Sequence, residues 1–369
     1  MQNDEYCNNE KKTKSKKISI TKLYKKIIEN YHHKNNFVIF KRPHEKKIYL
    51  YFNKNEDYKC LNKKYFIIKS FDKNHELKIV PHIIYYADIS KNLSNIKNSN
   101  YIFHWDTNSN FLTKSCKKKY KNLVKKGIKE IEKGDLKKVV LSRSVKISFH
   151  KIYLRKTFQK LIMSYPNALI SLCYNIYHGF WIGCTPELLI KFQKKNLLIS
   201  VLAGTIWENN IWTKKEIKEH NIVVNYIQKI LKFYKGVLSI KKTRVKKMGH
   251  LKHLETLILF SFFKSPNYNK ILNEIYPTPS ICGIPKKKSF NFIKENEGYK
   301  RNFYTGYIGI VDKESMELYL NLRCAKIRKE KNEITLYAGS GITIDSNVDK
   351  ELKETENKIK NILSQLVFK

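Results

Sequence analysis

Residues 304–338 read YTGYIGIVDKESMELYLNLRCAKIRKEKNEITLYA, and the three apolar segments in this stretch decide the fold class. The segments are Tyr304–Val311, Met316–Ile327 and Glu333–Ala338, and short clusters of Lys, Glu and Asn separate them. Apolar runs between turn-forming clusters are typical of β-strands. Because the predicted strands follow one another without an intervening helix, they favour an α+β fold over a doubly wound parallel sheet.

Strand-like and helical segments continue through the rest of the chain. Apolar residues recur near the 3.6-residue period of a helix in three places, which are 117–133, 213–233 and 349–366. Further short apolar runs predict strands at 37–40, 47–52, 65–70, 78–86, 138–147, 168–174 and 179–183. The length allows one large domain or two ordinary ones, and along the chain we distinguish a Lys/Asn-rich flexible tail (1–18), a strand-rich N-terminal part (19–110) and a region that holds the candidate catalytic residues (111–369).

The composition is strongly basic, with 73 Lys and Arg against 32 Asp and Glu, which gives a net charge of +41. A basic protein of this kind can bind nucleic acid by neutralising phosphates. Only seven of the cations are Arg, however, and the Lys clusters are scattered along the chain rather than interleaved with aromatic residues. We therefore interpret the positive charge as the result of compositional drift in an AT-rich genome, and we expect no nucleic-acid partner.

Several other classes of protein are disfavoured. The longest apolar run, 254–263, is half the length of a membrane span, and the N-terminus has no apolar signal segment, so we expect a cytoplasmic protein with no membrane partner. The seven cysteines form no CxxC pair, which argues against a zinc ribbon. His250 and His253 have helical spacing, and we interpret them as part of a solvated helix face rather than a metal site.

Two charged residues stand in apolar surroundings that could support acid–base chemistry. Lys138 opens the apolar segment KVVLSR, and Glu187 lies in GCTPELL between apolar segments. A carboxyl group held between apolar strands tends toward a raised pKa. Taken alone, each residue could also be an ordinary surface charge.

A second group of carboxylates suggests a metal site. Glu351, Glu354 and Lys358 share one face of the last predicted helix, and Glu219 lies near the start of an earlier one. Carboxylate oxygens suit Mg²⁺, whereas a solvated face with a Glu354–Lys358 pair is the simpler interpretation. The sequence Gly339-Ser340-Gly341 lacks the rest of a dinucleotide fingerprint but could form a turn whose backbone N–H groups bind a carboxylate.

Together these segments resemble the chorismate-utilising enzyme family, which includes isochorismate, salicylate, anthranilate and aminodeoxychorismate synthases. The similar segments follow the family's order over about the C-terminal two-thirds of the chain. They are KVVLSR (138–143), GCTPELLI (183–190), LAGT (202–205), KEIKEH (215–220), YPTPSICGIP (276–285), YTGYIGIVD (304–312), LNLRCAKI (320–327), LYAGSGIT (336–343) and DKELKETENKIKNIL (349–363). The resemblance implies one domain of stacked, mainly antiparallel sheets surrounded by helices.

The resemblance also implies an activity. Members that add water to chorismate carry Lys at the position of Lys138, whereas the ammonia-using synthases typically carry Gln. Aminodeoxychorismate synthases typically carry a nucleophilic Lys at the position of Ala203. These residues favour a Mg²⁺-dependent isochorismate synthase, an isomerase with Lys138 as base and Glu187 as acid, and leave salicylate synthase as the alternative. No glutamine amidotransferase subunit is then expected.

The remaining site residues are also implied by the resemblance. Glu219, Glu351 and Glu354 match the family's Mg²⁺ carboxylates. The matches to its substrate-binding positions are Gly204, Thr205, Arg323, Gly339 and Lys358. One departure is Tyr276, where many relatives have His. Menaquinone and siderophore synthesis are both possible pathways, and the compositional drift favours menaquinone.

Overall fold

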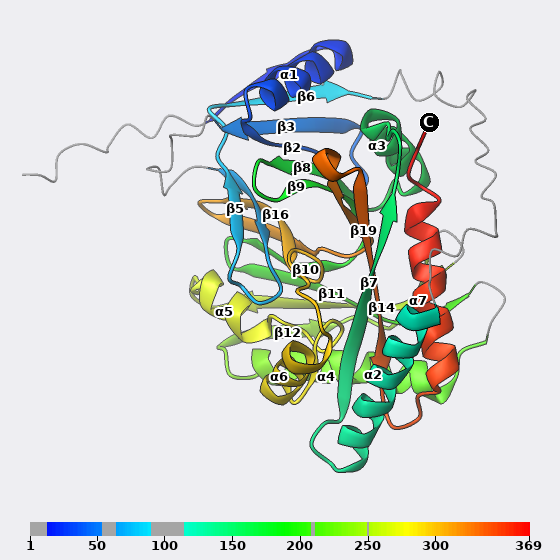
Figure 1. Cartoon of the computed structure of the whole chain (residues 1–369). Coiled ribbons are helices and arrows are strands. Elements are labelled where there is room, and N and C mark those ends of the chain that lie inside the picture. Colours follow the sequence, from blue (N-terminus) through cyan, green and yellow to red (C-terminus); the bar gives the residue numbers. More distant parts are fainter. Residues whose placement is uncertain (1–12, 54–63, 90–113, 208–210, 249–250) are drawn as a thin grey trace, which may run out of the picture.

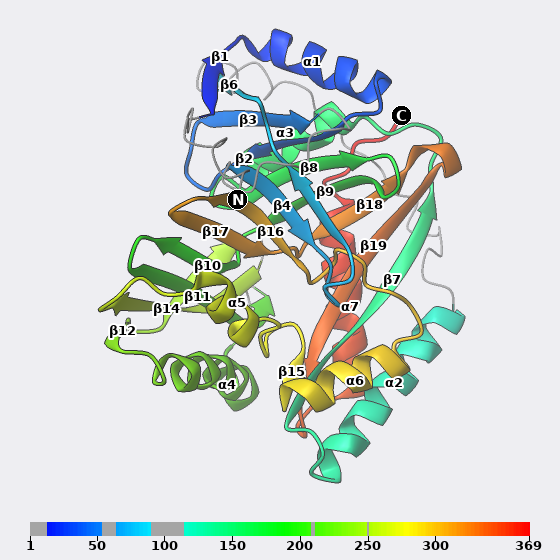
Figure 2. The ribbon, with the colours of Figure 1, turned by 90° about the vertical axis from the view of Figure 1, so that its left-hand side faces the viewer.

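The computed structural model describes residues 13–53, 64–89, 114–207, 211–248 and 251–369. Two large β-sheets pack face to face, and helices cover their outer surfaces (Figures 1 and 2). This architecture confirms the predicted α+β fold of stacked, mainly antiparallel sheets. Among the described residues, no helix combines the length and apolar content that a membrane span requires.

The first sheet has ten strands, and every pair of neighbouring strands in it is antiparallel except the parallel pair β1–β6. In spatial order the strands are β1 (Lys14–Lys17), β6 (Ile83–Asp88), β3 (Lys47–Asn53), β2 (Asn36–Lys41), β8 (Leu169–Asn175), β9 (Gly179–Thr185), β18 (Cys324–Arg328), β19 (Glu333–Ile342), β7 (Lys138–Ser148) and β15 (Gly283–Ile284).

The second sheet has nine strands, and all of its paired strands are antiparallel. Its strands are β12 (Gly236–Ile240), β14 (Leu251–Phe262), β11 (Asn196–Trp207), β10 (Leu188–Gln193), β17 (Ser315–Leu320), β16 (Tyr307–Asp312), β4 (Tyr65–Lys69) and β5 (Glu76–Ile79), with β13 (Arg244–Met248) also paired to β14.

Strand β2 shows how the ten-stranded sheet is buried on both faces. Phe37 and Ile39 belong to the core beneath the helices, whereas Val38 and Phe40 belong to the core between the two sheets. Successive side chains of a strand point to opposite faces, so a strand with two buried faces is continuously apolar rather than alternating. The run FVIF (37–40) has this composition because the strand lies inside the molecule.

Seven α-helices surround the sheets in the described part of the chain. They are α1 (Ile20–His32), α2 (Lys114–Glu132), α3 (Leu154–Ser164), α4 (Lys214–Leu231), α5 (Tyr268–Ile275), α6 (Lys286–Asn296) and α7 (Val348–Leu363). Helix α7 packs against β19 and α2, and α4 packs against β11, so α7 lies on the ten-stranded sheet and α4 on the nine-stranded sheet. The three helices predicted from periodicity are confirmed within a few residues at most boundaries.

Two predicted strands are each divided in the structure. The segment 316–327 forms β17 in the nine-stranded sheet and β18 in the ten-stranded sheet. The chain turns between them at Arg323, whose φ of 49° no strand can accommodate. The segment 78–86 likewise contributes to β5 and to β6, with Pro81 between them. Pro lacks the N–H that a sheet interior needs, which explains this second break.

Two further expectations need correction. Lys14–Lys17, inside the predicted flexible tail, form strand β1 at the edge of the ten-stranded sheet. All four residues are exposed, so main-chain pairing rather than apolar burial holds this segment, and residues 1–12 lie outside the described part. The Gly339-Ser340-Gly341 segment is not a turn, because it continues β19 and pairs with β7.

Candidate active site

A cavity lies where β9, β11 and β19 face the helices α4 and α7. Eight of the ten site residues that the sequence predicted line this cavity. They are Glu187, Gly204, Thr205, Glu219, Arg323, Gly339, Glu354 and Lys358. Segments more than 150 residues apart in the sequence are therefore brought to one place.

Lys138 lies directly behind the wall of this cavity. Its side chain is 0 % exposed, and its Nζ lies 2.7 Å from Glu219 Oε1. The contact has the distance of an ion pair but not the angles of a hydrogen bond, and Lys138 Nζ has no hydrogen-bond partner. Gly341, which lines the cavity together with Glu219, lies against this pair, and a Cβ atom there would lie 2.3 Å from Glu219 Oε1. A glycine is therefore needed at this point of β19.

Glu187 is buried at the end of β9, where the chain turns toward β10. Burial raises the pKa of this carboxyl group to about 7, although Ser280, Arg323 and Lys138 each act to lower it. Ser280 Oγ donates a hydrogen bond to Glu187 Oε1 over 2.9 Å. A carboxyl group with this pKa is substantially protonated near neutral pH, so it can donate a proton.

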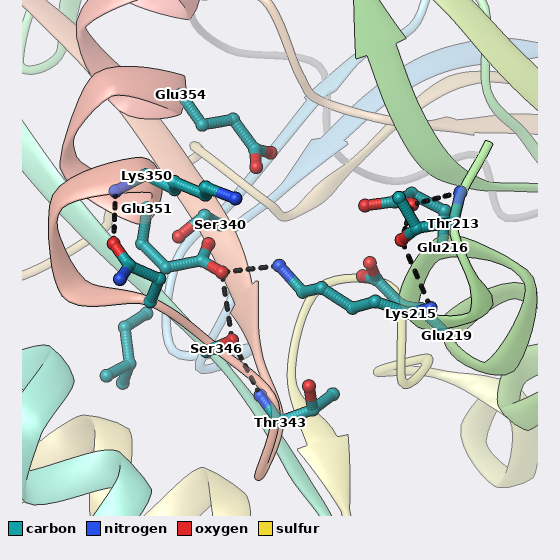
Figure 3. Close-up of polar contacts among 12 residues, drawn as sticks. Thr213, Lys215, Glu216, Glu219, Ser340, Thr343, Ser346, Lys350, Glu351 and Glu354 are labelled. Carbon is teal, nitrogen blue, oxygen red and sulfur yellow. Dashed lines mark hydrogen bonds and ion pairs between the residues drawn. The ribbon is translucent and has the colours of Figure 1, made fainter. Parts of the chain in front are cut away.

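The three predicted metal carboxylates are each paired with a lysine (Figure 3 shows Glu219, Glu351 and Glu354). Glu219 contacts Lys138, and Glu354 Oε1 accepts a hydrogen bond of 2.6 Å from Lys358. Lys215 Nζ donates to Glu351 Oε1. The expected Glu354–Lys358 pair is thus present, but it lies at the cavity rather than on a fully solvated face.

The ionisation of these carboxylates depends on their neighbours. Burial alone would raise the pKa of Glu219, but Lys138, Lys215 and Lys358 hold it below its usual value. The pKa of Glu354 is raised by burial and by the charges of Glu351 and Glu219, against the effect of Lys358. The three carboxylates are therefore close enough to repel one another.

The donor chemistry at this place suits a hard divalent cation. Glu351 Oε2 is buried and has no hydrogen-bond partner among the described residues, so this carboxylate has an unused ligand atom in the site. Among the described residues, no three His, Cys, Asp or Glu side chains converge into a ready-made metal site. The carboxylates fit Mg²⁺ in chemistry, and binding would require their lysine partners to rearrange.

His253 is a site residue that the sequence interpretation missed. It lies in strand β14 and is buried, so the expected solvated helix face is wrong for this residue, while His250 lies outside the described residues. Arg323 Nη2 donates to His253 Nε2 over 2.7 Å, and His253 Nδ1 lies 3.0 Å from Thr205 Oγ1. Because a guanidinium can only donate, Nδ1 carries the proton and donates to Thr205.

The protonation state of His253 follows from its surroundings. Burial, followed by the charges of Arg323 and Lys358, holds the pKa of His253 well below its usual value. The imidazole is therefore neutral and can accept the hydrogen bond from Arg323. The other terminal nitrogen, Arg323 Nη1, is buried and has no hydrogen-bond partner in the part of the chain that the structure describes. A buried donor of this kind is suited to bind a carboxylate of a ligand.

The remaining predicted positions shape the cavity wall. Gly204 has a φ of +71° at an irregularity in β11, and a Cβ atom there would lie 2.9 Å from the carbonyl oxygen of Glu216. Helix α4 can therefore approach β11 closely. Lys358 Nζ also donates to the carbonyl oxygen of Gly339 over 2.9 Å, which joins α7 to β19.

Tyr276 does not take part in the cavity. Its side chain is fully buried, and its hydroxyl group donates to the carbonyl oxygens of Thr305 (3.0 Å) and Phe71 (3.3 Å). Tyr276 is absent from the residues that line the cavity. The phenol therefore holds the backbone around the site together, and it does not replace a histidine that contacts a ligand.

Comparison with known proteins agrees with this geometry. The sequence profile of the family described as "Chorismate binding enzyme" matches residues 62–367. The vibriobactin-specific isochorismate synthase of Vibrio cholerae is 29% identical over 272 residues, which are 66% of each chain. The isochorismate synthase MenF of Escherichia coli is 28% identical over 253 residues, which are 64% of this chain and 57% of that protein.

A solved structure supports the fold. The crystal structure of DhbC from Bacillus anthracis superposes with a TM-score of 0.74 at 22% sequence identity. The match covers 93% of this chain and 99% of that one. The curated relatives are matched over less than two-thirds of their own length, whereas the family profile covers most of this chain. This chain belongs to the chorismate binding enzyme family.

Proposed function

We propose that the protein is a Mg²⁺-dependent isochorismate synthase that converts chorismate to isochorismate. The observation that carries this proposal is the pair formed by Glu187, whose pKa burial raises to about 7, and Lys138, which is buried near it. The two groups provide an acid and a base at one cavity in a family that binds chorismate. Relatives named isochorismate synthases support the same activity.

The proposed reaction exchanges one hydroxyl group for another on the ring. Lys138 takes a proton from a water molecule, and the water oxygen bonds to C2. The ring double bonds shift, the C4–O bond breaks, and Glu187 gives its proton to the departing hydroxyl group. One water molecule enters and one leaves, so the net reaction is an isomerisation.

Cationic side chains would hold the two carboxylates of chorismate. Arg323 offers a buried nitrogen without a partner, and Lys358 lies across the cavity on α7. Charge-assisted hydrogen bonds of this kind are stronger than neutral ones. Gly204, Thr205 and Gly339 would complete the binding surface with backbone and hydroxyl groups.

Glu219, Glu351 and Glu354 would hold the cation. A bound Mg²⁺ would supply positive charge that offsets and orients a substrate carboxylate. If Glu219 served as a ligand, its contact with Lys138 would be given up, and Lys138 Nζ would be available to the attacking water.

The pathway stays a prediction from composition. The relatives include a siderophore enzyme at 29% identity and MenF at 28%, so identity favours neither pathway. We expect menaquinone synthesis because a chain with such compositional drift comes from a genome that retains few accessory pathways.

A product assay tests the activity. Purified protein is incubated with chorismate and Mg²⁺, and the products are separated by chromatography. Isochorismate alone is the expected product, salicylate with pyruvate would support salicylate synthase, and unchanged chorismate would contradict both. Lys138→Ala and Glu187→Gln should each reduce turnover at least about a thousandfold, in line with the loss of a general acid or base.

A further inference from the structure

Lys215 lies where a cation would bind among the three carboxylates Glu219, Glu351 and Glu354. It lies in the first turn of α4 and reaches across to Glu351 in the first turn of α7 (Figure 3). Glu351 Oε1 accepts hydrogen bonds from Lys215 and, over 2.8 Å, from Ser346 Oγ. Two helices that are far apart in the sequence are thus joined by one ion pair.

Lys215 also lies between two cavities. It lines the inner cavity with Glu187 and Arg323, and it lines an outer groove between α4 and α7 with Glu351. Its side chain is 22% exposed, whereas Lys138 is 0% exposed. Lys215 can therefore move toward solvent, while Lys138 has no such freedom.

Each of the three carboxylates has a counter-ion without a metal. Glu219, Glu351 and Glu354 face three lysines, Lys138, Lys215 and Lys358, one for each carboxylate. Glu351 is 1% exposed, and a buried carboxylate without a partner would be strongly destabilising. Lys215 satisfies only one oxygen of Glu351, and the other has no partner. A divalent ion could use the oxygen that Lys215 now occupies only if Lys215 moved away.

We propose that Lys215 is a resident counter-ion that competes with Mg²⁺ for Glu351. In the metal-free protein it holds α4 against α7 and keeps Glu351 paired, and on metal binding it moves into the outer groove. Lys215 therefore stabilises the empty site and weakens its affinity for the metal. This inference rests on the proposed function only in taking these carboxylates as the Mg²⁺ ligands.

Metal binding without chorismate tests this proposal. Titration calorimetry with Mg²⁺ would compare the wild type with Lys215→Met and Lys215→Gln, which both remove the charge, while the amide of Gln can still hydrogen-bond to Glu351. We expect both variants to bind Mg²⁺ about tenfold more tightly, because a unit positive charge close to the ion is removed. Lys215→Arg, which keeps the charge, should bind about as the wild type does.

A matched control removes the same charge from the same helix. Lys218 lies on α4, is 62% exposed and is 3.6 Å from Asp345, so Lys218→Met should leave the Mg²⁺ affinity within about twofold of the wild type. Thermal unfolding gives a second readout. Lys215→Met should melt below the wild type in EDTA and gain more stability from the same Mg²⁺ concentration, since the stabilisation by a ligand increases with the logarithm of its concentration divided by Kd.

The outcomes separate this inference from the proposed function. Unchanged or weaker Mg²⁺ binding in both uncharged variants would overturn the role of Lys215, even if the wild type makes isochorismate. Tighter Mg²⁺ binding in these variants would support that role, even if chorismate is not converted. Absence of Mg²⁺ binding in the wild type and in both uncharged variants would overturn the inference.

Discussion

Glu187 combines burial with a position at the cavity, and its ionisation should govern the activity. The general acid must be protonated, and its pKa in the free protein is about 7. Raising the pH through this value removes the proton that the departing hydroxyl group needs. We therefore expect kcat/KM for chorismate to fall on the alkaline side of a pKa near 7, measured by initial rates from pH 5.5 to 9.

The hydrogen bond from Ser280 provides a variant that moves this pH profile. Ser280 lowers the pKa of Glu187, so Ser280→Ala should shift the alkaline fall in kcat/KM to higher pH. The rate below pH 6 should change little, because Glu187 is protonated there in both proteins. An alkaline fall that stays at the same pH in Ser280→Ala would show that another group controls it.

His253 should act through Arg323 rather than on the ring directly. The neutral imidazole joins Thr205 to Arg323 and leaves Arg323 Nη1 free for a substrate carboxylate. Removing this support in His253→Ala should raise KM about tenfold with a smaller effect on kcat, since a charge-assisted contact is worth about 1.5–3 kcal/mol. Steady-state kinetics would check this, and a loss confined to kcat would contradict it.

The sequence could identify Lys138 and Glu187 because each lies inside a recognisable segment. It did not single out Lys215, although Lys215 opens the similar segment KEIKEH, or His253, which lies outside the similar segments. Lys215 contacts a residue 136 positions away, and lysine is common throughout this chain, so neither spacing nor residue type distinguishes it. His253 was assigned to a helix because its spacing to His250 was considered without the pairing of β14 to β11, which places it beside Thr205.

At the scale of elements, Arg301 connects α6 to β7, the strand that begins with Lys138. Its guanidinium donates to Glu297 at the end of α6 (2.8 Å from Nε), to the carbonyl oxygen of Val140 (2.7 Å) and to that of Ile281 (2.9 Å). The side chains of Arg301 and Glu297 are 2% and 1% exposed. Each of these charges is therefore tolerated in the interior because the other one neutralises it.

Breaking this pair should be costly. Arg301→Met would leave Glu297 buried without its counter-ion, and we expect the free energy of unfolding to fall by about 3–5 kcal/mol. Urea unfolding followed by circular dichroism would measure the loss. The double variant Glu297→Met/Arg301→Met should be less destabilised than the sum of the two single variants, and simple additivity would argue against direct coupling.

Element boundaries were predictable where local chemistry sets them. Thr213 caps α4, and Glu216 completes a capping box with it, so the sequence places the start of this helix well. The division of 316–327 was not predictable, because its apolar pattern continues through Asn321 and only the change from one sheet to the other explains the turn at Arg323. That turn places the Arg323 side chain at the cavity.

At the scale of the whole molecule, the net charge of +41 is mostly unrelated to the chemistry at the cavity. The exposed lysines of helix α2 that do not line the cavity include the four residues Lys118, Lys119, Lys125 and Lys126. At 0.15 M salt, charges more than about 8 Å from a ligand are largely screened. Changing all four to Gln should therefore leave kcat/KM within about twofold, and a tenfold fall in initial rate would show that long-range attraction of chorismate matters.

The whole-molecule architecture was the most predictable level. Collinear segments pointed to a known family of stacked sheets, and the packing of the ten- and nine-stranded sheets confirms that arrangement. The sequence did not show that β1 closes one edge of the sheet, because main-chain pairing leaves no apolar pattern in Lys14–Lys17.

The central claim is that Lys138 activates a water molecule for attack on the ring while Glu187 protonates the departing hydroxyl group. Conversion of chorismate in H₂¹⁸O, with mass spectrometry of the product, tests it most directly. The account predicts isochorismate with one ¹⁸O atom, in the new hydroxyl group at C2. Isochorismate without ¹⁸O would contradict it, because the hydroxyl group would then have moved within the substrate.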